Sequence, residues 1–485
     1  MLFNSLEFLI FFPIVTTLYF ILPHKWRWLM LLVASCIFYM SFIPIYILIL
    51  FFTIIIDYIA GILIENASGN KRKLFLFLSL VSNLSILGFF KYFNFFNNSV
   101  SGLASLFGFT NPIPELNIIL PIGLSFHTFQ AMSYTIEVYF GRQKAERHFG
   151  IYSLYVMFYP QLVAGPIERP QNLVHQFYEK HNFDYQRVTD GLKLMAWGFF
   201  KKLVIADRLA LFVNNIYTQP AVHSGTSLIV ATIFFAYQIY CDFSGYSDIA
   251  LGAAQVMGFK LMINFDRPYA SKSISEFWRC WHISLSQWFR DYVYIPLGGN
   301  RVSVMKVYRN LFITFLLSGL WHGASWTFVI WGALNGVYLI VGAATKTWRN
   351  AFVYYIKLDM YPALHKSLQV VITFGLTCFA WIFFRAESIS DVFLIIKKIF
   401  CGPWGISRGG GLDSIFCGRS KVDFLIAIIA IITLEAIQLW AHRNDLIARV
   451  NALPSYIRWT LYYLLIWSII LFGMLGASKF IYFQF

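Results

Sequence analysis

The sequence predicts an all-α, polytopic membrane protein. Apolar runs recur along the whole chain, 58% of the 485 residues are hydrophobic, and only 13% are charged. Soluble globular proteins carry about 25% charged residues. Apolar residues follow one another without interruption in these runs, whereas the strands of a transmembrane β-barrel alternate apolar and polar residues, so a barrel is disfavoured. We therefore expect roughly ten to twelve transmembrane helices, each needing about 20 apolar residues, in one domain that spans residues 1–485.

Eight stretches are candidate single spans, of which Trp28–Phe42 is short and is expected to be either tilted or partly interfacial. They are Leu6–Leu22, Trp28–Phe42, Ile45–Ile64, Leu74–Phe96, Thr226–Ala250, Leu368–Phe384, Phe424–Leu439 and Leu461–Gly476.

Two further stretches are not simple spans. Ile119–Gly141 contains His127 and Glu137 and is too polar to face lipid, so we expect a buried, broken or re-entrant segment. Leu311–Ala344 would extend about 50 Å as one helix, which exceeds a bilayer core of about 30 Å. Its glycines and histidine, Gly319, His322, Gly323 and Gly332, should break it into two helices. This places a histidine-bearing core at about residues 119–345, between peripheral spans in 1–96 and 368–485.

The formal net charge of +15 does not indicate a nucleic-acid partner, because no basic stripe stands apart from the spans. The basic residues lie in short loops, as the positive-inside rule expects of cytoplasmic loops. Loops that carry Lys or Arg alternate with loops that carry none, which predicts that the N-terminus lies outside the cytoplasm. The first span is expected to remain uncleaved, and the helices are expected to be surrounded by membrane lipid. The basic residues that set the orientation are Lys25, Arg27, Lys71, Arg72 and Lys73.

Several kinds of site are not predicted. The six cysteines form no CxxC and no cluster with histidine at zinc spacing, so we expect no metal. No nucleophile elbow, Walker A, HExxH or GxGxxG motif is present. A covalent serine mechanism and ATP-driven transport therefore have no support.

The stretch from Ser275 to His322 is the most informative. Its first part is expected to form one amphipathic helix that carries Trp278, Trp281, Trp288, Arg279, Arg290 and His282. Tryptophans with arginines on such a helix are typical of an interfacial helix anchored at the lipid headgroups. That interpretation leaves His282 unexplained, and a second polar group of an active site is the alternative.

His322 lies inside an apolar segment of membrane grade. A histidine there is costly unless it is paired or faces a wet cavity, so it marks a functional site. An unperturbed pKa of ~6.5 suits a general base. A structural histidine bonded within the bundle is the alternative. Asp242, Asp248 and Glu137 are acids in or near spans; pairing with neighbouring cations is favoured over a proton or ion pathway.

Several stretches together resemble the membrane-bound O-acyltransferase family, in its bacterial alginate O-acetyltransferase branch. They run from the first residues to the C-terminal FIYFQF and include LPIGLSFHTFQ, LVAGPIERP, YCDFSGYSDIALG, FWRCWHISLSQWFRDYVYIPLGGNR and GLWHGASWTFVIWGALNG. One departure is Cys280, where the family pattern more often has Arg, which weakens a phosphate contact at that position.

The resemblance implies an enzyme of the bacterial inner membrane with a central tunnel, in which His322 is catalytic and His282 is the second active-site position. The acyl donor would be a cytoplasmic thioester, acetyl-CoA, with no tightly bound cofactor. The acetyl group would reach alginate, peptidoglycan or another envelope polysaccharide, usually through an esterase-like transferase partner. Expected donor or substrate contacts are Arg279, Arg290, Trp281, Asp242 and Trp321.

Two other functions remain open at the level of the sequence. A transporter or flippase for a glycan or acyl carrier would be favoured by repeated halves, and none is visible. A non-catalytic membrane subunit that anchors a partner would have no need of both histidines.

Overall fold

The structure, a computed structural model, describes residues 1–163, 165–402, 416–441, 443–474 and 480–481. Within these ranges the chain is helical and contains no strand, which confirms the all-α prediction. The helices form two compact units. Unit 1 comprises residues 1–195 and 246–262, and unit 2 comprises residues 196–245 and 263–485. The single domain expected from the sequence stays a prediction.

Unit 1 contains the N-terminal helices. They are α1 (Leu6–Ile21), α2 (His24–Met40), α3 (Ile47–Asn66), α4 (Gly69–Leu87), α5 (Phe93–Leu106), α6 (Leu124–Tyr139), α7 (Phe149–Met157), α8 (Tyr159–Leu162), α9 (Pro170–Leu173) and most of α10 (Tyr185–Phe199), with a π-helical turn at Gly88–Tyr92.

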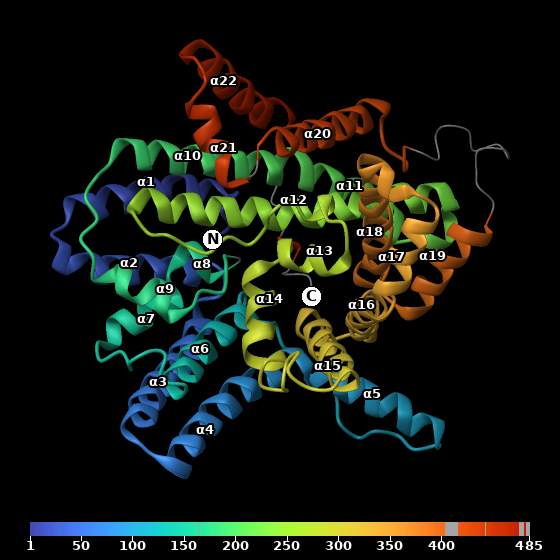
Figure 1. Ribbon diagram of the computed structural model, residues 1–485. Helices are drawn as coiled ribbons and strands as arrows, with labels where there is room; N and C mark the ends of the chain where they lie inside the picture. The colour runs from blue at the N-terminus through green and yellow to red at the C-terminus, as the bar shows by residue number, and fades with distance from the viewer. Residues whose placement is uncertain (164, 403–415, 442, 475–479, 482–485) are drawn as a thin grey trace. The chain divides into compact units, whose positions relative to one another are not determined.

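A buried polar network joins α3 to α4, which lie beside α6 in unit 1 (Figure 1). Ser79 Oγ donates a hydrogen bond to Asp57 Oδ1 at 2.6 Å, and Asn83 Nδ2 donates to Asp57 Oδ2 at 2.9 Å. Nearly every residue of α6 is buried, as expected for a segment too polar to face lipid. Gly123, with φ 75°, precedes the helix and breaks it from residues 118–122.

Unit 2 contains the remaining helices. They are α11 (Asp207–Tyr217), α13 (Ile274–Cys280), α14 (Ile283–Phe289), α15 (Val304–His322), α16 (Trp326–Ala344), α17 (Lys346–Tyr355), α18 (Pro362–Arg385), α19 (Ile389–Cys401), α20 (Lys421–Trp440), α21 (Arg443–Asn451) and α22 (Ser455–Phe472), with π-helical turns at Phe200–Ala206 and Arg290–Tyr294. The long helix α12 (Gly225–Met257) contributes to both units.

The predicted division of Leu311–Ala344 is confirmed, and it falls at residues 323–325, between α15 and α16. Gly319 and Gly332 do not break the chain; they allow the two helices to lie against each other (Figure 1). A Cβ at Gly319 would lie 2.9 Å from Gly332 Cα, so neither position has room for a side chain. Ser325 then starts α16, because its Oγ accepts a hydrogen bond from Thr327 N at 3.3 Å.

Seven helical segments of the described chain are long and apolar enough to cross a membrane. They are Pro44–Asn66, Gly69–Leu106, Gly225–Met257, Trp326–Ala344, Pro362–Arg385, Lys421–Trp440 and Ser455–Phe472. The larger sequence-based number also counted shorter stretches, such as α1 with its 16 residues. The C-terminal FIYFQF motif lies outside the described residues except for Phe480 and Ile481.

Candidate functional site

The single amphipathic helix predicted after Ser275 is wrong. The structure has two short helices, α13 and α14, and the chain turns between them at Trp281 and His282. His282 has φ 43° and ψ 56°, a left-handed conformation that few residues other than glycine adopt. Helical periodicity could not reveal this turn, since it continues through positions 281 and 282 without interruption.

Asn264 holds the left-handed turn through contacts on both of its oxygens. Its backbone carbonyl accepts a hydrogen bond from Ile283 N at 2.9 Å. Its Oδ1 accepts bonds from Ser284 N at 3.3 Å and from Ser284 Oγ at 2.7 Å. Asn264 is fully buried, so these bonds are shielded from water. Asn264 therefore positions His282, although nothing in the local sequence singled it out.

The tryptophans of this segment lie in the protein core, so the predicted interfacial anchoring is wrong for them. Trp281 is fully buried, and Trp278 and Trp288 are also buried. The Trp281 ring stacks on Phe277 at 5.4 Å between centroids, and Trp278 Nε1 donates a hydrogen bond to Asn335 Oδ1 at 3.3 Å. A tryptophan side chain can pack against lipid headgroups or against other side chains of its own chain. In this fold the tryptophans pack against other side chains of the protein core.

His322 is the last residue of α15 and is 2% exposed. Three aromatic rings lie edge-on to its imidazole: Trp321 at 5.0 Å, Trp331 of α16 at 5.0 Å and Phe384 of α18 at 5.4 Å between centroids. The ring therefore sits where three helices converge and is almost completely shielded from solvent. The tunnel expected to reach it stays a prediction.

The structure brings the two predicted catalytic histidines to the same aromatic cluster of unit 2. Trp321 lies next to His322 in the chain, and its ring is 6.1 Å from that of His282. His282 is also fully buried, with Phe243 edge-on at 4.6 Å between centroids. Burial lowers the pKa of His282 to about 3, so the ring is neutral at physiological pH. Nothing in the sequence distinguishes Phe243 from the other aromatic residues of its span.

Asp242, the residue before Phe243, belongs to a buried ion-pair network. Its Oδ1 lies 2.6 Å from Lys202 Nζ, which is also 2.8 Å from Asp207 Oδ1. Its Oδ2 accepts a hydrogen bond from the backbone N of Ile481 at 2.7 Å. Asp242 therefore pairs with a neighbouring cation and fixes the chain near its C-terminus, as the favoured sequence interpretation expected.

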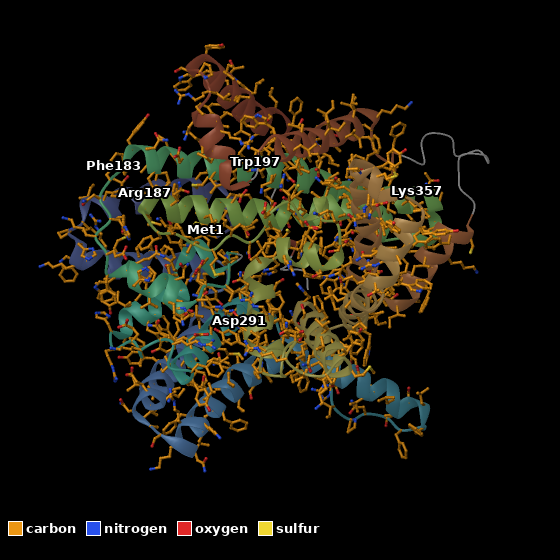
Figure 2. The ribbon with its side chains drawn as sticks, viewed as in Figure 1. Met1, Phe183, Arg187, Trp197, Asp291 and Lys357 are labelled. Atoms are coloured by element: carbon orange, nitrogen blue, oxygen red, sulfur yellow. The ribbon has the colours of Figure 1, made fainter. Side chains whose placement is uncertain are left out.

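Arg279 and Arg290, the expected donor contacts, are both exposed. Arg290 Nε lies 2.8 Å from Oδ1 of Asp291, which is labelled in Figure 2. Along the chain, Arg279 precedes the turn at His282 and Arg290 follows it. Both arginines are exposed, whereas His282 is buried. The role of the two arginines as donor contacts stays a prediction.

In unit 1, Glu137 lies 3.5 Å from Arg142 Nη1 and accepts a hydrogen bond from Gln171 Nε2 at 2.6 Å. This again agrees with pairing over an ion pathway. Across the ranges that the structure describes, no group of three or more histidines, cysteines or acids could hold a metal ion, and all six cysteines are free thiols.

Comparison with known proteins identifies the family. A family model described as MBOAT, membrane-bound O-acyltransferase family, matches residues 142–384. The chain belongs to this family. The matched residues contain both His282 and His322 and most of the helices around them. The protein is thus a multi-pass membrane O-acyltransferase, which favours the enzyme over the transporter and the anchoring subunit.

Similar curated proteins are bacterial. The protein of Pseudomonas aeruginosa named "Probable alginate O-acetylase AlgI" is 39% identical over 84% of this chain and 76% of its own length. The "Peptidoglycan O-acetyltransferase" of Helicobacter pylori is 35% identical over 82% of this chain and 79% of its own length. The "Teichoic acid D-alanyltransferase" of Bacillus subtilis is 28% identical over 56% and 71%, respectively.

Proposed function

We propose that this membrane O-acyltransferase takes an acetyl group from cytoplasmic acetyl-CoA and delivers it, through a partner transferase, for the O-acetylation of an extracytoplasmic polysaccharide. The observation that carries the proposal is the pair of buried histidines, His282 and His322, whose rings both lie against Trp321. The relatives named as O-acetylating enzymes favour an acetyl group and a glycan acceptor.

In the proposed reaction, His322 is the general base. Its unprotonated ring nitrogen takes the proton of the acceptor hydroxyl as the oxygen attacks the carbonyl carbon of the thioester. The new C–O bond forms a tetrahedral intermediate with a negatively charged oxygen. When the C–S bond breaks, the carbonyl re-forms, and the coenzyme A sulfur leaves as a thiolate that takes the proton from His322. The imidazole is thereby regenerated.

His282 is proposed to stabilise the tetrahedral oxyanion. A neutral imidazole has one N–H to donate, and the low pKa of His282 keeps the ring in that neutral form. The left-handed turn at His282 and the bonds from Asn264 fix the ring before substrate arrives. A donor fixed in advance in a water-poor site stabilises developing charge more than a mobile donor does.

The exposed arginines Arg279 and Arg290 are proposed to bind the phosphates of coenzyme A, since guanidinium groups form paired hydrogen bonds with phosphate oxygens. Trp281 and Trp321 would then shape the path of the acyl chain. Acetyl-CoA is a substrate in this scheme and is not a resident cofactor.

The proposed setting is the inner membrane of a bacterium, with the N-terminus outside and the basic loops in the cytoplasm. A periplasmic or membrane-anchored esterase-like transferase is the proposed partner, and it would pass the acetyl group to the final polysaccharide. Alginate and peptidoglycan, named for two relatives, are the first acceptors to test.

The proposal is tested with His322→Ala in the full chain, purified in detergent or expressed in a deletion strain. We expect the release of coenzyme A from acetyl-CoA and the acetylation of envelope glycans to fall at least about a hundredfold, as for loss of a general base. The matched control is His365→Ala, which makes the same change near the start of α18 and should leave the rate unchanged. Wild-type turnover by a correctly inserted His322→Ala protein would refute the mechanism.

A further inference from the structure

The helix α17 of unit 2 carries an exposed aromatic face. Every residue of this helix is exposed except Val353, which is half-buried. Trp348, Phe352 and Tyr355 follow one another at intervals of four and three residues, so they lie on one side of the helix. Their exposed fractions are 81%, 60% and 83%, respectively. Three adjacent aromatic rings on a protein surface indicate a contact with something outside the chain.

The position of α17 in the chain shows what that contact is. The helix connects Trp326–Ala344 with Pro362–Arg385, and both of these helices are long and apolar enough to cross a membrane. α17 contacts α16 (Figure 1), and Arg349 Nη2 donates a hydrogen bond to Gly342 O near the end of α16 at 2.7 Å. α17 is therefore held where two spans end, which is the boundary between lipid and water.

Basic side chains accompany the aromatic face. Lys346 and Arg349 lie on other sides of α17, Lys357 follows the helix, and Lys366 lies in the first turns of α18. All four are exposed, and the sequence from 346 to 366 contains one acid, Asp359. A helix with aromatic residues on one face and cations on the others is typical of a helix that lies in the membrane interface.

The backbone at Lys357, which is labelled in Figure 2, supports a role for its side chain. This residue has φ 53° and ψ 29°, a left-handed conformation that glycine usually occupies at the end of a helix. A lysine is strained in this conformation, whereas a glycine is not. The turn thus carries a cationic side chain that its own geometry does not require.

We propose that α17, together with Lys357 and Lys366, forms a binding surface for phospholipids with an anionic headgroup. The aromatic face packs against the upper part of the acyl chains, and the cations pair with the negatively charged headgroups. A phospholipid without net charge offers the acyl chains alone, so it should bind more weakly. The proposal does not rest on the proposed reaction, because it uses neither histidine of the candidate site.

The test uses the full chain in lipid nanodiscs of either phosphatidylglycerol, which is anionic, or phosphatidylcholine, which has no net charge. Hydrogen exchange of the backbone amides of residues 346–361 is followed by mass spectrometry. We expect exchange to be at least about fivefold slower in phosphatidylglycerol, which is the effect of one cation at an anionic surface. The difference should shrink as the salt concentration is raised, because salt screens exposed charges.

Variants separate the two parts of the surface. The combination of Lys346→Gln, Lys357→Gly and Lys366→Gln removes three charges and should abolish the difference between the two lipids. The matched control is Lys272→Gln, which removes the charge of an exposed lysine outside this segment and should keep the difference. Trp348→Ala should speed exchange in both lipids, because the contact of the ring does not depend on the charge of the headgroup.

Equal exchange of wild type in the two lipids would overturn the proposal. Protection that appears only when other envelope proteins are present would assign this surface to a protein partner and would also overturn it. For the case in which the combined variant does not insert, Lys357→Gly alone provides a second test. It should unfold at nearly the wild-type temperature, because glycine relieves the strained turn, and should reduce the lipid preference by up to about fivefold. An unchanged lipid preference would exclude Lys357 from the surface and contradict the proposal.

Discussion

Gly319→Ala should displace the candidate catalytic residue His322, although Gly319 itself is not part of the candidate site. An added Cβ would lie 2.4 Å from Phe328 O and 2.9 Å from Gly332 Cα, whereas ordinary contact begins at 3.4 Å. Both atoms belong to α16, whose backbone cannot rotate away, so α15 and α16 must separate by about 1 Å. His322 lies one turn beyond Gly319, and its neighbour Trp331 is on α16.

The expected effect is larger on the rate than on the fold. Overpacking by one methyl group costs typically ~1–3 kcal/mol of stability, which a protein of this size survives. A displacement of about 1 Å in a reacting group costs roughly a hundredfold in rate. We therefore expect an inserted, folded Gly319→Ala protein whose release of coenzyme A is slowed by about that factor.

The control is Gly342→Ala, the same change on α16 at a position where a Cβ meets nothing within 4 Å. It should keep the wild-type rate and unfold at the same or a slightly higher temperature, since alanine favours helix by up to ~1 kcal/mol. Rates that match for Gly319→Ala and Gly342→Ala would refute the claim that the close approach of these helices sets the position of His322.

Three further outcomes are expected. Asn264→Ala should lower kcat more than it raises KM, because the turn at His282 loses the hydrogen bonds that hold it. Asn264→Asp keeps an acceptor oxygen and should therefore retain part of the rate. Equal losses of rate in the two variants would contradict this role of Asn264. Lys202→Met should lower the free energy of unfolding, measured by thermal denaturation, by about 3–5 kcal/mol, because two buried carboxylates lose their cation. Asp242→Asn should lower it by less, because Lys202 keeps its second partner, Asp207. Burial raises the pKa of Glu168 from 4.5 to about 7, so the folded state holds a proton that the unfolded chain releases. Stability should therefore fall by up to ~3 kcal/mol as the pH rises through that window, and Glu168→Gln should flatten the dependence; an unchanged slope would rule out this carboxyl as its source.

The sequence alone was informative where the signal is local or compositional. Long apolar runs fixed the class of the fold, because a chain in lipid must satisfy its backbone within each helix. The polar character of residues 119–141 correctly predicted a buried segment, and the glycine-rich stretch around His322 correctly predicted two helices. His322 stood out because a histidine is rare in an apolar segment, whereas His282 was assigned to the site through the family resemblance.

The two wrong predictions, the interfacial tryptophans and the single helix after Ser275, share one cause: a periodic pattern does not show what an apolar face packs against or where the chain turns. The pattern of Trp278, Trp281 and Trp288 is amphipathic whether the apolar face meets lipid or protein, so the sequence could not tell an interfacial helix from a core. Helical periodicity also ran through His282, although the chain turns there. That turn depends on Asn264, which is distant in the chain and makes its bonds only after folding.

What the sequence determined by itself is thus the helical, membrane-embedded class of the protein and the identity of its two candidate catalytic side chains. What only the tertiary structure decided is their arrangement, with both rings against Trp321 and each fixed by helices or bonds from elsewhere in unit 2. The physical reason is that composition and spacing report the solvent a segment prefers, whereas the direction of a side chain is set by the atoms that packing brings to it from far along the chain.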